Sequence, residues 1–266
     1  MMSTQVATPA STSGKSAISA VPFSRLLAVE LRKLVDTRAG KWLLIAIGLV
    51  TLAVIVIFLF VADSAELTFS NFVDATATPQ GLLLPVLGIL AVTSEWSQRT
   101  GLVTFTLEPS RQRVVTAKFV ALLILGLAAV LLAIALAAAG NGLGMALRDG
   151  DGSWSFGLGG IRDVFLLQGI GLIQGFAFGM LFMNSAAAIV LYFILPIASS
   201  FLFQIVTWLK DHLAEWIDLG TAQTPLQTHE MGGNDWAQLG VACLIWVALP
   251  FVIGLIRLLR SELKSA

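Results

Sequence analysis

The sequence predicts an all-α polytopic membrane protein with six transmembrane helices. Hydrophobic residues make up 57% of the 266 residues and charged residues only 12%. That is too little charge to cover a water-soluble domain. Apolar segments of about 20 residues, the length that crosses a bilayer, take up most of the chain. Lys and Arg concentrate in alternate connections between them, as in multi-pass proteins. Little chain is left for a soluble catalytic domain.

The chain begins with a segment that predicts no packed structure, followed by an amphipathic helix. Residues 1–21 are rich in Ser, Thr, Ala and Pro and predict a disordered cytoplasmic tail. Residues 22–41 alternate apolar and basic side chains at three- and four-residue steps, which predicts an amphipathic helix just before the first span. Such a helix lies in the membrane interface or docks on a partner protein, and both roles remain open. The expected helix residues are Phe23, Leu26, Leu27, Leu31, Arg32 and Lys33.

The transmembrane domain is predicted over residues 42–260, followed by a short cytoplasmic tail over 257–266. Pro85 interrupts the second apolar segment, which on length alone could be re-entrant. Polar loops are predicted at 63–79 and 140–163, and a tight turn at Asn184-Ser185. Residues 207–235 contain an amphipathic pattern and predict a helical outer loop. The six spans are expected at about 42–62, 76–96, 119–139, 164–183, 186–206 and 237–256.

The distribution of charged residues indicates which connections lie on each side of the membrane. With six spans, 13 Lys and Arg residues fall on the side of the termini and three on the other. Five acidic residues fall on the side of the termini and 11 on the opposite side. The positive-inside rule therefore places both termini in the cytoplasm of a cell-membrane protein. A re-entrant second segment would put a dense basic cluster outside, so six spans are favoured.

The sequence lacks the groups that an intramembrane enzyme or an ion-coupled transporter needs. His229-Glu230 begins an HExxH zinc pattern, but Gly233 stands where the second histidine should be. No GxSxG motif is present, and no carboxylate lies deep in an apolar segment. We therefore expect no catalytic residue, no metal and no cofactor in this chain, and no nucleic-acid partner.

Polar and aromatic residues of the spans offer a candidate substrate pathway. The alternative is that the polar groups simply hydrogen-bond between helices and that the aromatic groups anchor the protein at the interface. The fourth span also carries overlapping GxxxG spacings at Gly171, Gly175 and Gly179, which predict close helix packing within the bundle. The candidate pathway residues are Gln174, Asn184, Phe201, Phe203 and Gln204.

A charged island between the second and third spans carries a family resemblance. It contains Glu95, Arg99-Thr100-Gly101, Leu107, Pro109 and a basic stretch of Arg111, Arg113 and Lys118. With the six spans and the preceding amphipathic helix, this pattern resembles the permease subunit of ABC-2 type exporters, over nearly all of the chain after Pro22. The resemblance implies that the island forms a cytoplasmic coupling helix that enters a cleft on a separate ATPase.

The residues of the island are compatible with that role. Glu95 can pair with Arg99 one helical turn on, and Val103, Phe105 and Leu107 offer an apolar strip to a partner. Arg111, Arg113 and Lys118 are expected among anionic lipid heads. The alternative is a solvated loop with snorkelling basic side chains.

The resemblance implies the membrane subunit of an ATP-driven exporter for a hydrophobic or amphipathic drug, lipid or peptide. The expected partners are two copies of an ABC ATPase, which bind the ATP and Mg²⁺, a second permease subunit and membrane lipid. The alternative function is a non-transporting membrane sensor or assembly scaffold.

Overall fold

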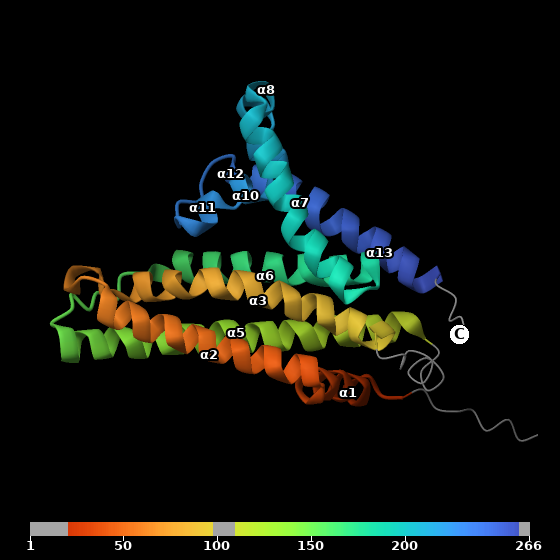
Figure 1. Cartoon of the computed structure of the whole chain (residues 1–266), viewed down its shortest axis with the longest axis horizontal. Coiled ribbons are helices and arrows are strands. Elements are labelled where there is room, and N and C mark those ends of the chain that lie inside the picture. Colours follow the sequence, from red (N-terminus) through yellow and green to blue (C-terminus); the bar gives the residue numbers. More distant parts are fainter. Residues whose placement is uncertain (1–20, 98–109, 261–266) are drawn as a thin grey trace, which may run out of the picture.

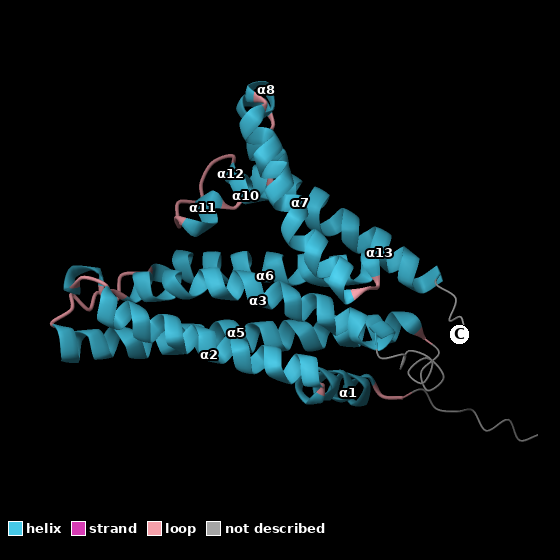
Figure 2. Cartoon of the chain, viewed as in Figure 1, coloured by secondary structure: helices cyan, strands magenta, loops and turns pink. Residues whose placement is uncertain are grey.

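The computed structural model describes residues 21–97 and 110–260, and every regular element in these two ranges is a helix (Figure 2). Six helices are long and apolar enough to cross a membrane, which confirms the number of predicted spans and makes the chain a multi-pass membrane protein. They are α2 (Arg38–Val61), α3 (Phe69–Ser97), α5 (Arg111–Arg148), α6 (Gly157–Phe182), α7 (Ser185–Ile205) and the continuous segment Asp235–Arg260.

The helices form a bundle and a diverging pair (Figure 1). Helices α2, α3, α5 and α6 run side by side, and α1 (Phe23–Asp36) packs across one end of them, against α2 and α5. We call this the α1 end, and the opposite end, where η1 (Ser64–Glu66) lies, the far end. Helix α7 leads away from the bundle, and α13 (Leu249–Arg260) runs at an angle to the bundle and packs against α6.

Short helices and a π-helical turn complete the diverging part of the molecule. The connection between α7 and the last span folds into α8 (Thr207–His212), α9 (Ala214–Ile217), α10 (Leu219–Ala222) and α11 (Thr224–Gln227). The last span consists of α12 (Asp235–Cys243), the π-helical η2 (Leu244–Ala248) and α13. Pro250, the second residue after η2, has no N–H to donate to a carbonyl one turn earlier, which fits a local change of hydrogen-bond pattern.

Helix α3 passes through both Pro79 and Pro85 without a break, so the second apolar segment is a full span rather than a re-entrant one. It also begins at Phe69, and the predicted loop over 63–79 is therefore wrong in extent. The Thr68 hydroxyl accepts a hydrogen bond from the Asn71 N–H at the start of this helix. This is the capping arrangement that lets a polar stretch begin a helix.

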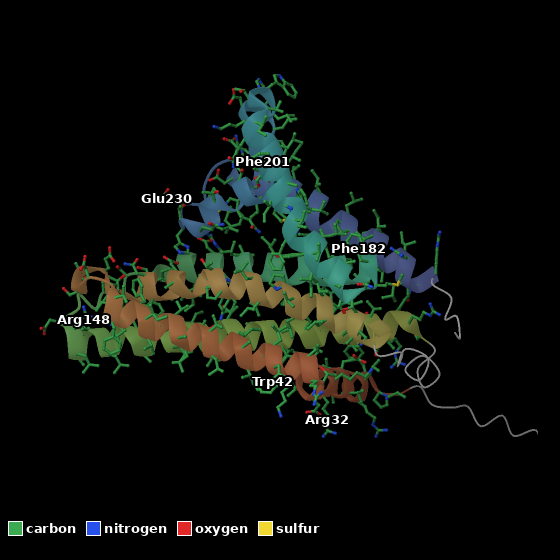
Figure 3. All side chains as sticks on the ribbon, viewed as in Figure 1. Arg32, Trp42, Arg148, Phe182, Phe201 and Glu230 are labelled. Carbon is green, nitrogen blue, oxygen red and sulfur yellow. The ribbon has the colours of Figure 1, made fainter. Side chains whose placement is uncertain are left out.

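The predicted loop over 140–163 is also wrong in extent, because α5 continues to Arg148 and α6 begins at Gly157. Gly140 lies in α5 against Ile55 and Phe72, so packing outweighs the low helix propensity of glycine there. Arg148, at the far end (Figure 3), donates hydrogen bonds to the carbonyls of Leu59, Phe60 and Ala62, which satisfies acceptors at the end of α2.

The tightest packing joins α3 and α6. A Cβ added at Gly175 would lie 2.1 Å from the Pro85 carbonyl oxygen, and one added at Gly88 would lie 2.5 Å from the Leu172 carbonyl oxygen. The two backbones therefore touch, as the GxxxG spacing of the fourth span predicts for packing within the bundle.

Helix α7 and the last span bury smaller shares of their residues than the other four spans. Only 11% of the α7 window and 17% of the Asp235–Arg260 window is buried, against 56% for α6. Phe201 lies on the part of α7 that points away from the bundle and is 63% exposed (Figure 3). In a membrane such surfaces contact lipid or another protein chain.

Candidate functional site

Four oppositely charged side chains meet at the α1 end, and we call them the ionic network. Glu30 and Lys33 come from α1, Glu95 from the end of α3 and Lys118 from α5. Lys33 Nζ lies 2.8 Å from Glu30 Oε1 and 2.7 Å from Glu95 Oε1. Lys118 Nζ lies 2.6 Å from Glu30 Oε2 and 3.0 Å from Glu95 Oε1. Each ammonium group therefore bridges both carboxylates, and the network joins three helices.

The network is mostly withdrawn from water. The side chains of Glu30, Glu95 and Lys118 are 2%, 6% and 7% exposed, and that of Lys33 is 33% exposed. Burying isolated charges is very costly, and the cost is offset only where opposite charges and hydrogen bonds compensate it. Three of the four contacts join different helices, and the fourth, between Lys33 and Glu30, lies within α1. The three contacts between helices depend on α1, α3 and α5 keeping their positions.

The periodicity of α1 explains how a charged group comes to be buried. Leu26, Glu30 and Leu34 are its three buried residues and recur every four positions, on one face of the helix. Leu26 packs against Val114 and Ala117 of α5. This apolar contact holds α1 against α5. Glu30 lies on the same face of α1 and therefore reaches Lys118, which is one turn after Val114 on α5.

A helix, α1, occupies most of the segment predicted to be amphipathic, and it ends at Asp36 and not at residue 41. Its placement at a membrane interface stays a prediction. Leu26 is buried, and Leu27 and Leu31 are partly buried against the main hydrophobic core. Phe23 is 39% exposed, and Arg32 is exposed near the α1 end (Figure 3).

Lys118 differs from its predicted role. The sequence placed it among lipid head groups, but its side chain is buried between Glu30 and Glu95. A lysine at the start of an apolar segment looks like an interfacial anchor, and only the fold reveals two carboxylates beside it. Arg111 donates to the Leu258 carbonyl and Arg113 to the Val21 carbonyl, so both tie other segments to the start of α5.

The remaining coupling residues lie outside the described part of the chain. They are Arg99, Thr100, Gly101, Val103, Phe105 and Leu107. The pairing of Glu95 with Arg99 therefore stays a prediction, as does the apolar contact strip.

Within the described residues, the candidate pathway residues do not gather in one cavity. Gln174 lines a cavity between α3, α6 and α11, whereas Phe203 and Gln204 line a separate one beside α9 and α10. Asn184 is exposed and caps the start of α7, where its side chain accepts from the Ala187 N–H. With Phe201 exposed on α7, the pathway prediction stays untested within a single chain.

Glu30 is the network residue that the sequence analysis did not single out. The sequence did contain an indication that Glu30 is buried, because this glutamate lies on the apolar face of the helix between Leu26 and Leu34. Its partner Lys118 is 88 positions away in the chain. No local pattern connects residues at that separation.

The titration of Lys33 gives a test of the network. Burial lowers the pKa of Lys33, but the carboxylates of Glu95 and Glu30 raise it by more, so it lies above the ordinary 10.5. A raised pKa means that the ammonium contributes stability below pH 10.5 and loses it as the pH rises through the higher folded value. We expect Lys33→Met to melt below the wild type at pH 8 and the gap to shrink above pH 10.5. A gap that is unchanged up to pH 12 in thermal unfolding would contradict the ionic role of Lys33.

The fold and the network define a class, a multi-pass helical membrane protein with an amphipathic helix fixed to two spans by buried charges. Comparison with protein-family models, with curated proteins and with solved structures finds no match for this chain.

Proposed function

We propose that this chain is the transmembrane subunit of an ATP-driven exporter and works with a separate ATPase subunit. The observation that carries the proposal is the ionic network. It fastens α1 to the end of α3 and to the start of α5, the two helices that flank residues 98–109 in the chain. A push on that connection, or on α1, acts on both spans, because the three helices share buried charges.

Charge supports a cytoplasmic position for the α1 end. The segment before the first span, the island and the tail after the last span carry 13 of the 16 Lys and Arg residues. By the positive-inside rule these regions face the cytoplasm, where an ATPase has access to ATP. The ATP and Mg²⁺ belong to that partner, because this sequence has no complete Walker motif.

The exposed apolar faces of α7 and α13 support a pair of permease subunits. Ile197 and Leu249 are 70% and 54% exposed on these two helices. A second copy or a related subunit would cover part of this surface and enclose a pathway. We expect its cargo to be hydrophobic or amphipathic, such as a drug, a lipid or a peptide.

The test uses co-expression with the ABC ATPases of the same genome, followed by purification and ATP hydrolysis measurements in nanodiscs. We expect one ATPase to co-purify and its hydrolysis to respond to this chain. The triple variant Val103→Ala, Phe105→Ala and Leu107→Ala should lower that response about tenfold, a usual size for coupling between two sites.

The matched control removes the same number of apolar side chains at and near the far end. Leu143, Leu147 and Leu158 are 48%, 63% and 87% exposed, and their triple alanine variant should leave the response unchanged. If no ATPase co-purifies, or if both triple variants behave alike, the proposal is wrong.

A further inference from the structure

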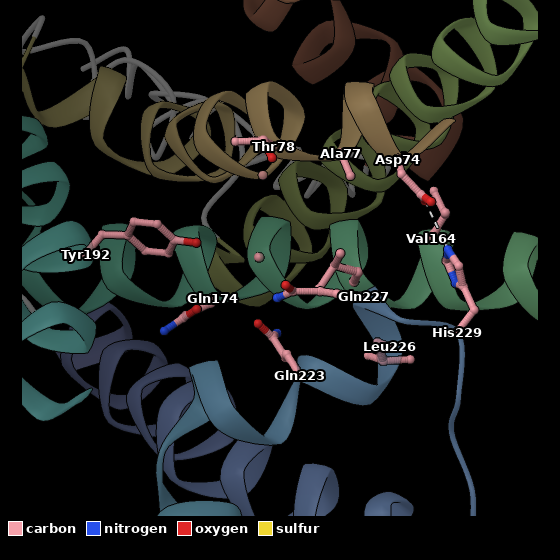
Figure 4. Close-up of a pocket in the computed structure, with 13 residues that line it drawn as sticks. Asp74, Ala77, Thr78, Val164, Gln174, Tyr192, Gln223, Leu226, Gln227 and His229 are labelled. Atoms are coloured by element: carbon pink, nitrogen blue, oxygen red, sulfur yellow. Dashed lines mark hydrogen bonds and ion pairs between the residues drawn. The ribbon is translucent and has the colours of Figure 1, made fainter. Parts of the chain in front are cut away.

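A cavity of about 400 Å³ with a mixed polar and apolar lining lies between the bundle and the short helices that follow α7 (Figure 4). Helices α3 and α6 form one wall, Tyr192 of α7 lies at one end and α11 with the residues beside it forms the opposite wall. The volume is in the range of small-molecule sites. Its polar lining residues are Asp74, Thr78, Gln174, Tyr192, Gln223, Gln227 and His229, and its apolar ones include Val164, Leu167 and Leu226.

One end of the cavity is closed by a histidine between two carboxylates. His229 Nε2 lies 3.0 Å from Asp74 Oδ1 of α3, and its Nδ1 lies 3.6 Å from Asp163 Oδ2 of α6. Arg162 pairs with Asp163 at 2.7 Å, and the rings of His229 and Phe156 meet in a T-shaped contact. These contacts hold the segment after α11 against the bundle, so the cavity has a fixed wall.

Gln174 contributes a buried carboxamide to the wall of this cavity. The residue is 3% exposed and lines the cavity. Its Nε2 is fully buried and has no hydrogen-bond partner among the described residues. The fold therefore leaves part of the hydrogen-bonding capacity of this side chain unused, which is uncommon for a buried polar group.

The lining defines the chemistry of that molecule. Three residues with carboxamides, Gln174, Gln223 and Gln227, line the cavity from both walls, and a carboxamide carries a carbonyl acceptor and an NH₂ donor. This set complements the C=O and N–H of another amide. No Lys or Arg lines the cavity, and Asp74 adds negative charge, which disfavours anions. Leu167 and Leu226 provide apolar surface for an aliphatic group.

We propose that this cavity binds a small uncharged molecule with peptide-like amide groups and an aliphatic side chain. The inference does not depend on the transport proposal, because binding is measured on this chain alone. The probe is N-acetyl-leucinamide, and its charge-bearing counterpart is N-acetyl-leucine.

The experiment is calorimetric titration of the full chain in nanodiscs. We expect N-acetyl-leucinamide to bind with a Kd of about 1 mM, as usual for a probe of about 12 non-hydrogen atoms. N-acetyl-leucine, which carries a carboxylate, should bind at least about tenfold more weakly. Glucose, which has hydroxyls but no amide, should not bind at 1 mM.

Variants locate the binding in the cavity. Gln174→Leu keeps the size of the side chain but removes the carboxamide and should weaken binding about tenfold, and Gln227→Leu on the opposite wall should act in the same direction. Gln112→Leu, an exposed position of α5 at the α1 end, should bind like the wild type. Melting temperatures show that each variant is folded, and Gln227→Leu decides the matter if Gln174→Leu does not fold.

Three results would overturn the proposal. They are equal binding of amide and acid, binding of glucose as tight as that of the amide, and full affinity in the Gln227→Leu variant and any folded Gln174→Leu variant. A wild-type chain that binds no amide probe would do the same.

Discussion

Replacing Lys118 by methionine should destabilise the protein by about 3 kcal/mol, the usual cost of breaking a buried ion pair by removal of one partner. Lys118 is the cation that both Glu30 and Glu95 share deep in the network, at 2.6 Å and 3.0 Å. Without it, two buried carboxylates compete for Lys33, which is one third exposed. Thermal unfolding in detergent should show the lower midpoint. Lys41→Met serves as the control, because Lys41 is exposed at the start of α2.

A double variant separates charge from packing. Glu30→Leu with Lys118→Met removes one charge of each sign and leaves the pair between Lys33 and Glu95. Buried ion pairs are often replaced by apolar residues at little cost. The double variant should therefore be more stable than Lys118→Met alone. If the two substitutions simply add, or if Lys118→Met is as stable as Lys41→Met, the network contributes nothing to assembly.

The second large effect is expected at Gly175. Even alanine there would put its Cβ 2.1 Å from the Pro85 carbonyl oxygen, a backbone atom that has no freedom to rotate away. Helices α3 and α6 would have to separate along their closest contact, and we expect a loss of about 3 kcal/mol or more.

Gly169 of the same helix is the matched control. A Cβ added at this position meets nothing within 4 Å. Gly169→Ala should be neutral or stabilising by about 0.5–1 kcal/mol, because alanine loses less backbone freedom in a helix. Unfolding curves of the two variants should therefore shift in opposite directions. Equal shifts would contradict direct backbone contact between α3 and α6.

The spans could be predicted because a bilayer imposes a length and a composition that each of them meets locally. Their ends could not, since Thr68 begins α3 with a side-chain hydrogen bond and Gly140 stays helical through its contacts with Phe72. Both effects depend on neighbours that propensity does not include.

The sequence predicted some residues of the ionic network but not that they lie together. Glu95, Lys33 and Lys118 stood out by charge, yet they were assigned to three different tasks. Lys33 and Glu95 are 62 positions apart, and only the packing of α1 against α5 brings their helices together. The acid pair around His229 had no local signal either, since His229 and Asp74 are separated by 155 positions.

The π-helical turn η2 sets the rotational phase between the two halves of the last span. Before it, Ala242 of α12 packs with Leu219 and Ala222 of α10, and after it Arg257 of α13 donates to the Leu181 carbonyl of α6. An α-helix turns by about 100° per residue, so a single residue taken out of 244–248 would swing one half around the axis by that angle. Either α12 would then lose its contact with α10, or α13 would lose its contact with α6. The π-helical turn thus changes the direction in which the side chains of the following residues point, so that one span can pack against α10 before the turn and against α6 after it.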